Sequence, residues 1–346
     1  MIYFNSDYLE GAHPSIMVRL AETNMVQTVG YGEDEYCEAA REKIKTACQA
    51  PEADVHFLVG GTQTNTTVIA AILRPWQGVI SAVSGHINCH EAGAIESTGH
   101  KVITLPTTNG KITAQQVQDY VEGTETMSPR STSSSPVWCT SPTPLREARC
   151  IPRRELTALY DICRRYGLPL FIDGARLGYG LMAEESDMTL PEIARLCDVF
   201  YIGGTKVGAL FGEAVVIMNE NLKKDFRFIM KQRGGRMAKG LLLGVQFDTL
   251  FTNDLYFKIS RHAIEMAHQI RDIFVSAGYP LLFDSPTNQQ YPIMSDDELA
   301  ILGKSFGYEY WERVDETHSG VRFCASWATK QEHVDALRAA VNALKK

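Results

Sequence analysis

The sequence predicts an α/β protein with a mostly parallel central sheet flanked by helices, followed by a smaller C-terminal α+β domain. Short apolar runs alternate with helical patterns through most of the chain. Most of these runs are continuous, which is typical of strands that helices cover on both faces. Such alternation favours parallel strands joined by helical crossovers. We expect a large domain over residues 1–250, with an N-terminal arm, and a small domain over residues 251–346.

The expected strands are short runs rich in Val, Ile and Phe. They are Val55–Val59, Val79–Val83, Val102–Leu105, Val137–Thr140, Leu170–Asp173, Val199–Gly203 and Ala214–Met218. A helix is expected at Arg153–Tyr166, where Leu156, Leu159 and Cys163 recur at helical spacing. Gly167 is placed to end this helix.

After residue 250 the pattern changes to that of the small domain. The sequence predicts a long helix, Leu255–Ala277, then short strands and a final helix, Lys330–Leu344. Earlier in the chain, Gly123–Pro136 is poor in apolar residues and contains a run of Ser and Thr. This segment is predicted to be an exposed loop without a role in a site.

The composition excludes several classes of function. The chain has 346 residues, 45% of them apolar, so it can bury more than one core. The net charge is −7, and no basic run suggests a nucleic-acid surface. No stretch of about 18 uncharged apolar residues could span a membrane, and the N-terminus has no signal-peptide pattern. The eight cysteines form no CxxC pair and are interpreted as buried, reduced thiols of a cytoplasmic protein.

A first candidate site lies where an expected strand runs through Gly60, Gly61 and Thr62 into a helical pattern. Glycines let backbone N–H groups approach an anion, and a helix N-terminus adds partial positive charge. The Thr62 hydroxyl adds a further donor. The pattern therefore predicts a phosphate cradle, although a plain glycine turn capped by Thr62 would look the same.

A second candidate is Asp173, which follows the apolar run Leu170–Ile172. Parallel α/β sheets present their ligands at the carboxyl ends of strands. There Asp173 could keep a pyridine nitrogen protonated, so that the ring accepts electrons. The alternative is a strand-end turn or a helix cap, since Asp173 precedes Gly174.

A third candidate is Lys206, which lies in a glycine-rich apolar loop directly after the expected strand Val199–Gly203. Burial would lower the pKa of the ammonium and free the amine as a nucleophile toward an aldehyde. The alternative is an incidental loop lysine. The order of cradle, strand-end acid and lysine makes the three candidates support one another.

A metal site is a further possibility at His86, Cys89, His90 and Glu91. Their spacing matches neither the zincin helix motif nor a zinc finger, so we expect no metal. His90 is interpreted as a residue on the face of a helix.

The chain resembles the threonine aldolases, in the β-eliminating-lyase branch of the fold type I pyridoxal-phosphate (PLP) enzymes. The resemblance runs nearly end to end. The matching pieces are Asn5-Ser6-Asp7, Gly32-Glu33-Asp34-Glu35-Tyr36, Gly61-Thr62-Gln63-Thr64-Asn65, His86-Ile87-Asn88-Cys89-His90-Glu91-Ala92-Gly93, Asp173-Gly174-Ala175-Arg176-Leu177, Thr205-Lys206 and Val321-Arg322-Phe323.

The resemblance implies PLP as the cofactor and a fold like that of the PLP transferases. Lys206 would carry the cofactor as a Schiff base, Asp173 would face the pyridine nitrogen and Arg176 the ring hydroxyl. His86 would stack on the ring and help take a proton from the substrate hydroxyl. Gly61 would hold the phosphate together with two hydroxyl residues, Thr62 and Thr205.

The resemblance also implies a shared site in a homodimer or homotetramer. Ser6 and Arg322 would bind the substrate carboxylate, and Tyr36 would line the pocket of the neighbouring subunit. A cation would reach the partner's phosphate: Lys239, with Arg233 and Arg236 as alternatives. The chain departs from the family at Thr205, where a serine is usual, and at the segments Gly234–Gly240 and Thr143–Glu147.

The function implied is cleavage of a β-hydroxy-α-amino acid, such as L-threonine or L-allo-threonine, to glycine and an aldehyde. The resemblance leaves two alternatives open. One is a PLP-dependent β-eliminating amino-acid lyase that expels a group from Cβ. The other is a catalytically silent binding protein with the same fold, against which the intact Lys206, Asp173, Arg176 and His86 argue.

Overall fold

The computed structural model describes residues 1–107, 110–127, 135–140 and 150–345. Its centre is a seven-stranded sheet in the order β2-β8-β7-β6-β5-β3-β4. These strands are β2 Asp54–Leu58, β3 Gln77–Ala82, β4 Lys101–Leu105, β5 Ser135–Thr140, β6 Leu170–Ile172, β7 Val199–Gly203 and β8 Glu213–Ile217. All seven expected strands are therefore confirmed. The expected parallel character is also confirmed, because β8 alone among these seven described strands runs antiparallel to both its neighbours.

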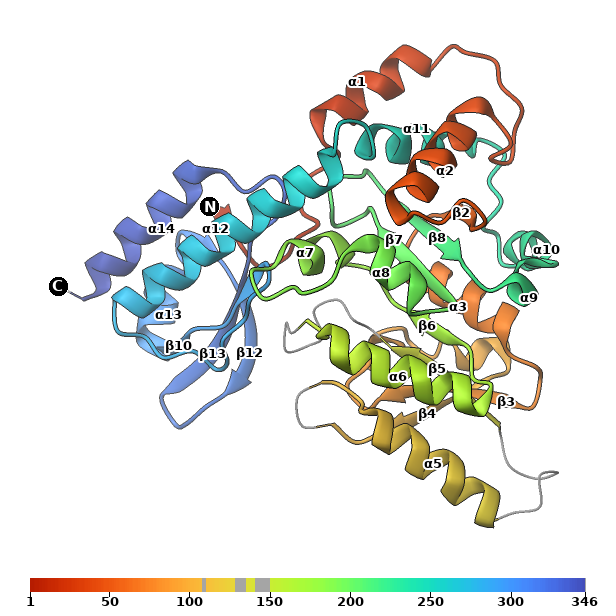
Figure 1. The fold of residues 1–346 in the computed structure, drawn as a ribbon. Helices are drawn as coiled ribbons and strands as arrows, with labels where there is room; N and C mark the ends of the chain where they lie inside the picture. The colour runs from red at the N-terminus through yellow and green to blue at the C-terminus, as the bar shows by residue number, and fades with distance from the viewer. Residues whose placement is uncertain (108–109, 128–134, 141–149, 346) are drawn as a thin grey trace.

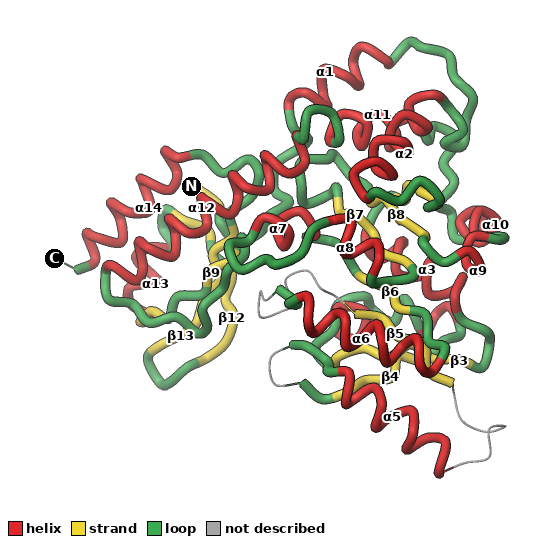
Figure 2. Tube along the Cα trace, viewed as in Figure 1, coloured by secondary structure: helices red, strands yellow, loops and turns green. Residues whose placement is uncertain are grey.

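The strands of this sheet are apolar on both faces. Along β6 and β7, Leu170 and Phe200 belong to one buried cluster, whereas Phe171 and Tyr201 belong to another. Helices cover both faces, as Figure 2 shows. The first cluster includes residues of α2 Glu35–Cys48, α6 Arg153–Tyr166, α8 Leu190–Arg195 and α11 Leu241–Leu250, and the second those of α3 Gly61–Ile72, α4 His86–Cys89 and α10 Phe226–Gln232.

The expected helix at Arg153–Tyr166 is confirmed as α6, and Gly167 ends it with a φ of 64°. The expected loop at 123–136 is wrong at both ends. Helix α5 continues to Met127 from its start at Ala114, and strand β5 begins at Ser135. A strand that pairs with its neighbours satisfies its backbone groups even where the side chains are small and polar. Residues 128–134 and 141–149 lie outside the described part, including Thr143–Glu147.

The C-terminal part has a separate sheet, in which β13 His318–Cys324 pairs with β9 Gln289–Gln290, β10 Ile293–Ser295 and β12 Glu309–Arg313. Three helices pack against this sheet: α12 Leu255–Ser276, α13 Asp296–Leu302 and α14 Gln331–Leu344. Both helices expected in this part of the chain are therefore confirmed.

Two features tie this part to the rest of the chain. The N-terminal strand β1 Ile2–Tyr3 pairs with β11 Phe306–Gly307, so the chain begins beside the C-terminal part (Figure 1). The helix α12 contributes Tyr256 to the core of the large sheet and Ile270 to the C-terminal core. The domain boundary at 250/251 stays a prediction.

The remaining elements are short or peripheral. They are α1 Pro14–Thr23, η1 Glu96–Thr98, α7 Leu177–Met182 and α9 Glu220–Lys223. None of the helices in the described ranges is both long and apolar enough to cross a membrane. Five cysteines are free and buried: Cys37, Cys48, Cys163, Cys197 and Cys324. Cys150 is free and half-buried, whereas Cys89 is free and exposed, against the expectation for that residue.

Candidate active site

A cavity of about 500 Å³ lies at the carboxyl ends of β2, β3, β6 and β7, where parallel α/β sheets usually bind ligands. Residues of the large sheet and of the C-terminal sheet line it together. They are Tyr8, Gly61, Asn65, Ser84, Gly85, His86, His90, Asp173, Ala175, Arg176, Tyr201, Lys206, Gln289, Glu309, Tyr310, Trp311 and Arg322. Five residues singled out from the sequence are thus brought together with Gly61: Lys206, Asp173, His86, Arg176 and Arg322.

Lys206 lies in the loop that leaves β7. Burial lowers the pKa of its ammonium, and so does the nearby Arg176, while the carboxylates of Asp7, Asp173 and Glu213 oppose that shift. The result is an amine more readily neutral than that of a surface lysine. The expectation that burial lowers this pKa is confirmed.

A buried acid, Glu213, forms hydrogen bonds with the loop that carries Lys206. Its Oε2 accepts a hydrogen bond from the Gly204 N–H at 3.0 Å, and the Thr205 hydroxyl also bonds to it. Thr205 Oγ1 in turn accepts from the N–H of Gly212, whose φ of 113° favours glycine. Burial raises the pKa of Glu213 to about 8, against the effects of Thr205 and Lys206. Glu213 is not among the residues singled out from the sequence, although an acid directly before the expected apolar strand Ala214–Met218 is a usable signal.

Asp173 is buried and fixed by three donors. Its Oδ1 accepts from the Tyr201 hydroxyl at 2.5 Å and from the Ala175 N–H at 3.0 Å, and its Oδ2 accepts from Asn65 Nδ2 at 3.2 Å. The next residue, Gly174, has no room for a side chain, because a Cβ there would lie 1.6 Å from the Tyr201 carbonyl oxygen. The Asp-Gly pair therefore lets the strand end pack directly on β7.

His86 begins α4 and is half-exposed toward the cavity. Its Nδ1 lies 2.8 Å from Oε1 of Glu91, which is buried and also accepts from Asn65 Nδ2 at 2.7 Å. A proton on Nδ1 that bonds to Glu91 leaves Nε2 as the ring atom that can accept a proton. Asn65 thus joins the acid that follows β6 to the histidine that follows β3.

Three of the four residues considered for a metal have other roles, since Glu91 bonds to His86 and His90 faces the cavity. His90 lines the cavity with its ring 5.5 Å from that of His86, so its interpretation as a helix-face residue is wrong. The reason is that α4 ends at Cys89, which turns His90 off the helix. No group of three or more metal-ligating side chains gathers anywhere in the described ranges.

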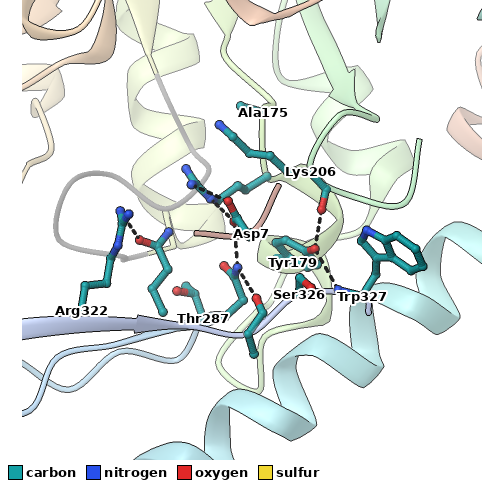
Figure 3. A network of polar contacts seen from close by, with 12 residues as sticks. Asp7, Ala175, Tyr179, Lys206, Thr287, Arg322, Ser326 and Trp327 are labelled. Atoms are coloured by element: carbon teal, nitrogen blue, oxygen red, sulfur yellow. Dashed lines mark hydrogen bonds and ion pairs between the residues drawn. The ribbon is translucent and has the colours of Figure 1, made fainter. Parts of the chain in front are cut away.

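Arg176 forms an ion pair with Asp7 of the N-terminal arm, a residue that Figure 3 labels. Its Nε and Nη2 donate to the two carboxylate oxygens at 2.5 and 2.9 Å. Asn288 donates to the same carboxylate at 2.9 Å and also to the Ala325 carbonyl. Burial would raise the pKa of Asp7, but Arg176 outweighs it and the value falls to about 2. This ion pair joins the arm, the large sheet and the C-terminal part.

Figure 3 also shows a second link to the C-terminal part. The Tyr179 hydroxyl donates to the Lys206 carbonyl at 2.5 Å and accepts from the Trp327 N–H at 3.3 Å. The backbone of the lysine loop is therefore anchored to the chain that follows β13.

Arg322 projects from β13 and is largely buried. Its guanidinium donates to Gln289 Oε1 at 3.2 Å, to the Asn5 carbonyl at 3.0 Å and to the Glu309 carboxylate, and it stacks on the Trp311 ring. Ser6, which follows Asn5 in the N-terminal arm, is buried, and its hydroxyl has no partner among the described residues.

Five predicted site residues do not line the cavity in the described part of the chain: Ser6, Thr62, Thr205, Tyr36 and Lys239. Thr62 is exposed in the first turn of α3, and Tyr36 is half-buried in α2 below the Arg19 guanidinium. Lys239 is exposed. Of its two alternatives, Arg236 is paired with Glu33 at 2.8 Å, and Arg233 is half-buried.

The residues present fit a PLP cofactor. Three groups face the same space, and each suits one part of the cofactor. The amine of lowered pKa suits the aldehyde, the fixed carboxylate suits the pyridine nitrogen, and the imidazole suits the face of the ring. Several buried polar atoms of the lining have no partner among the described residues, including Ser84 Oγ, Asn65 Oδ1 and Arg322 Nε. Such atoms are expected where a polar ligand completes the hydrogen bonding.

A family comparison agrees with this arrangement. The model of the family described as beta-eliminating lyases matches residues 4–337. The chain belongs to the beta-eliminating lyase family. This family is PLP-dependent, and the chain falls in its threonine aldolase branch.

Three relatives illustrate the likeness. The threonine aldolase of Leishmania major is 37% identical, each chain is covered completely, and the TM-score is 0.96. The low specificity L-threonine aldolase of Pseudomonas aeruginosa is 26% identical over 341 residues, which are 96% of this chain and 95% of the relative. A serine palmitoyltransferase from Sphingomonas wittichii shares the fold with a TM-score of 0.71 at 12% identity, over 99% of this chain and 86% of that one. The expected fold type I architecture is confirmed.

Proposed function

We propose that this beta-eliminating lyase family member is a PLP-dependent aldolase. It cleaves a β-hydroxy-α-amino acid, such as L-threonine or L-allo-threonine, to glycine and an aldehyde. The observation that carries the proposal is the joint placement of Lys206, Asp173, His86 and Arg322 around one cavity. The full-length likeness to threonine aldolases supports it.

Each residue has a part in holding the reactants. Lys206 would bind the cofactor aldehyde, Asp173 would hold the proton of the pyridine nitrogen, and Arg176 lies beside them, oriented by Asp7. The N-terminus of α3 at Gly61 would face the phosphate. When bound, the cofactor accepts the electron pair that the broken Cα–Cβ bond leaves at Cα.

The substrate would be gripped at one end and deprotonated at the other. Arg322 and the unpartnered hydroxyl of Ser6 would bind the carboxylate, which fixes the rotation about Cα. His86 would accept the β-hydroxyl proton at Nε2 while Glu91 holds Nδ1. The Cα–Cβ bond then breaks to give the aldehyde, and a proton returned to Cα gives glycine.

Product analysis tests this function. Purified holoenzyme incubated with L-threonine should release glycine and acetaldehyde in equal amounts. Ammonia and a keto acid would instead identify a β-eliminating lyase that uses the same lysine and acid. Borohydride should attach the cofactor to the peptide that holds Lys206, and attachment to any other lysine would overturn the assignment.

The site is completed, in this proposal, by a second copy of the chain. Large apolar side chains are exposed on α1 and the segment after it: Met17, Val18, Met25, Val26, Val29 and Tyr31. A patch of this kind usually marks a protein interface. Tyr36 and the exposed Lys239 would reach the neighbouring site, in a homodimer or homotetramer. The free thiols support a reducing, cytoplasmic location.

A further inference from the structure

The guanidinium of Arg322 already holds a carboxylate of its own chain. Glu309 of β12 is the direct cross-strand partner of Arg322 on β13, so both side chains lie on the same face of the sheet. The Glu309 carboxylate accepts from Nη2 of Arg322. Both residues line the cavity, and the arginine side chain is 12% exposed whereas the glutamate is 49% exposed.

The N–H donors of Arg322 are too few to bind both Glu309 and the carboxylate of a ligand in a fork. A guanidinium offers two forks to a carboxylate, one made of Nε and Nη2 and the other of Nη1 and Nη2. Both forks need Nη2. The two hydrogens of Nη2 are taken by the Asn5 carbonyl and by Glu309, while Nε is buried without a partner in the described part of the chain.

One of these two contacts must therefore open before a carboxylate can bind in a fork. The Asn5 carbonyl is backbone of the N-terminal arm, which Asp7 anchors to Arg176. The Glu309 side chain is half-exposed, and among the described residues it bonds to Arg322 alone. Turning this side chain into solvent disturbs no backbone, so Glu309 is the group that can leave.

We propose that Glu309 occupies the place of the substrate carboxylate on Arg322 and is displaced when an amino acid binds. The inference rests on the proposed function only in taking Arg322 as the carboxylate-binding residue. Its consequence is selectivity. An amino acid replaces one carboxylate on the arginine by another, whereas an amine without a carboxylate leaves the Arg322–Glu309 pair in place.

The test is a calorimetric titration of the holoenzyme with glycine and, as the matched ligand without a carboxylate, methylamine. Glu309→Gln keeps the shape of the side chain but weakens its hold on Arg322. An exposed ion pair of this kind is worth up to about a factor of five in an equilibrium constant. The glycine dissociation constant should fall by roughly two- to fivefold, and that of methylamine should not change. The change in KM for L-threonine should exceed the change in kcat.

Glu312→Gln is the matched control, because Glu312 is an exposed acid on the same strand that does not line the cavity. It should alter neither titration. In an Arg322→Ala background, Glu309→Gln should have no further effect on glycine binding. Glu309→Ser serves as a second variant if the glutamine protein folds poorly.

Three results would overturn the inference: glycine binding that is unchanged or weaker in Glu309→Gln, an equal gain in Glu312→Gln, or a gain that persists without Arg322. Failure of the proposed function looks different. If the products are ammonia and a keto acid while Glu309→Gln still tightens glycine binding, the aldolase proposal falls and the inference stands.

Discussion

Lys206 and Arg322 line the same cavity but are held in different ways. Lys206 belongs to one loop after one strand, and two of its supports, Glu213 and Gly204, lie within ten residues of it. One further link runs through the Tyr179 hydroxyl to the Trp327 N–H. Arg322 depends on contacts from β9, β12 and the N-terminal arm, more than 300 residues away in the last case. The cofactor side of the site is therefore fixed mainly by the central sheet. The substrate side forms only when the N-terminal arm has docked beside β13 and its sheet neighbours β9 and β12.

This difference predicts which substitutions stop chemistry and which change binding or assembly. Changes near Lys206 should act on turnover while the fold persists. Changes around Arg322 and Asp7 should act on substrate affinity, on stability or on both.

The largest effect is expected for Asp173→Asn. The amide keeps the shape of the side chain but cannot hold a proton on a pyridine nitrogen as a carboxylate does. We expect kcat to fall by about a hundredfold or more, with cofactor absorbance and the melting temperature near those of the wild type. Activity close to the wild-type value would make Asp173 a structural cap at the end of β6. The claim that substitutions on the cofactor side mainly affect turnover would then be wrong.

A second prediction concerns residues that we assign to different subunits. Arg322→Ala and Tyr36→Ala should each be inactive or nearly so. Refolded together, they should regain about a quarter of the wild-type activity, since half of randomly paired dimers are hybrids and each hybrid has one intact site. Activity is measured by aldehyde release, and hybrid formation by differently tagged chains. Hybrids that form but stay inactive would place both residues in the same site of one chain.

The same division explains what the sequence alone could predict. Strand-end positions such as Asp173 and Lys206 follow from local patterns, because a parallel sheet brings the carboxyl ends of its strands together whatever lies between them. The pairing of Arg176 with Asp7, 169 residues apart, depends on where the N-terminal arm docks. The Glu309–Arg322 pair depends on a strand register that no local pattern fixes.

His90 and Thr205 illustrate the same limit within single segments. A helical pattern placed His90 on a helix, but α4 stops one residue earlier. The resemblance assigned the Thr205 hydroxyl to the phosphate, yet that hydroxyl bonds to Glu213 and the Gly212 N–H in the structure. Both outcomes depend on hydrogen bonds that form only in the folded chain, so the role of Thr205 stays a prediction.

A third prediction tests the docking of the N-terminal arm. Asp7→Asn leaves the Arg176 guanidinium buried without its anion, which should lower the free energy of unfolding by about 3 kcal/mol. In the wild type the lowered pKa of Asp7, about 2, adds stability above pH 4 that is lost as the pH falls toward 2. That loss should amount to about 2 kcal/mol and be missing from the variant.

Urea unfolding at several pH values measures both effects, with Asp161→Asn, an exposed acid on α6, as the control. A variant as stable as the wild type at pH 7 would show that the arm is held by its apolar contacts alone. The substrate side of the site would then not depend on the Asp7–Arg176 ion pair.

The smallest effect is expected for Glu213→Gln, which removes the acid that bonds to the lysine loop. The Gln oxygen can still accept from the Gly204 N–H, so the loop should keep its shape. Glu213 raises the pKa of Lys206, so its loss should lower the pH at which the amine becomes neutral. The midpoint is read from the pH dependence of PLP incorporation into the apoprotein, followed by absorbance.

The pH dependence of the free energy of unfolding tests the same substitution independently. Burial raises the pKa of Glu213 from 4.5 to about 8, so the folded wild type binds this proton more tightly than the unfolded chain does. The contribution of Glu213 is therefore greatest below pH 4.5 and is lost as the pH rises toward 8. The free energy of unfolding should change less over this range in Glu213→Gln than in the wild type, whereas Glu265→Gln, at an exposed position on α12, should match the wild type. A PLP incorporation midpoint that stays in place or moves upward would mean that Lys206 does not share a proton with Glu213. The nearby carboxylates of Asp7 and Asp173 would then control its charge.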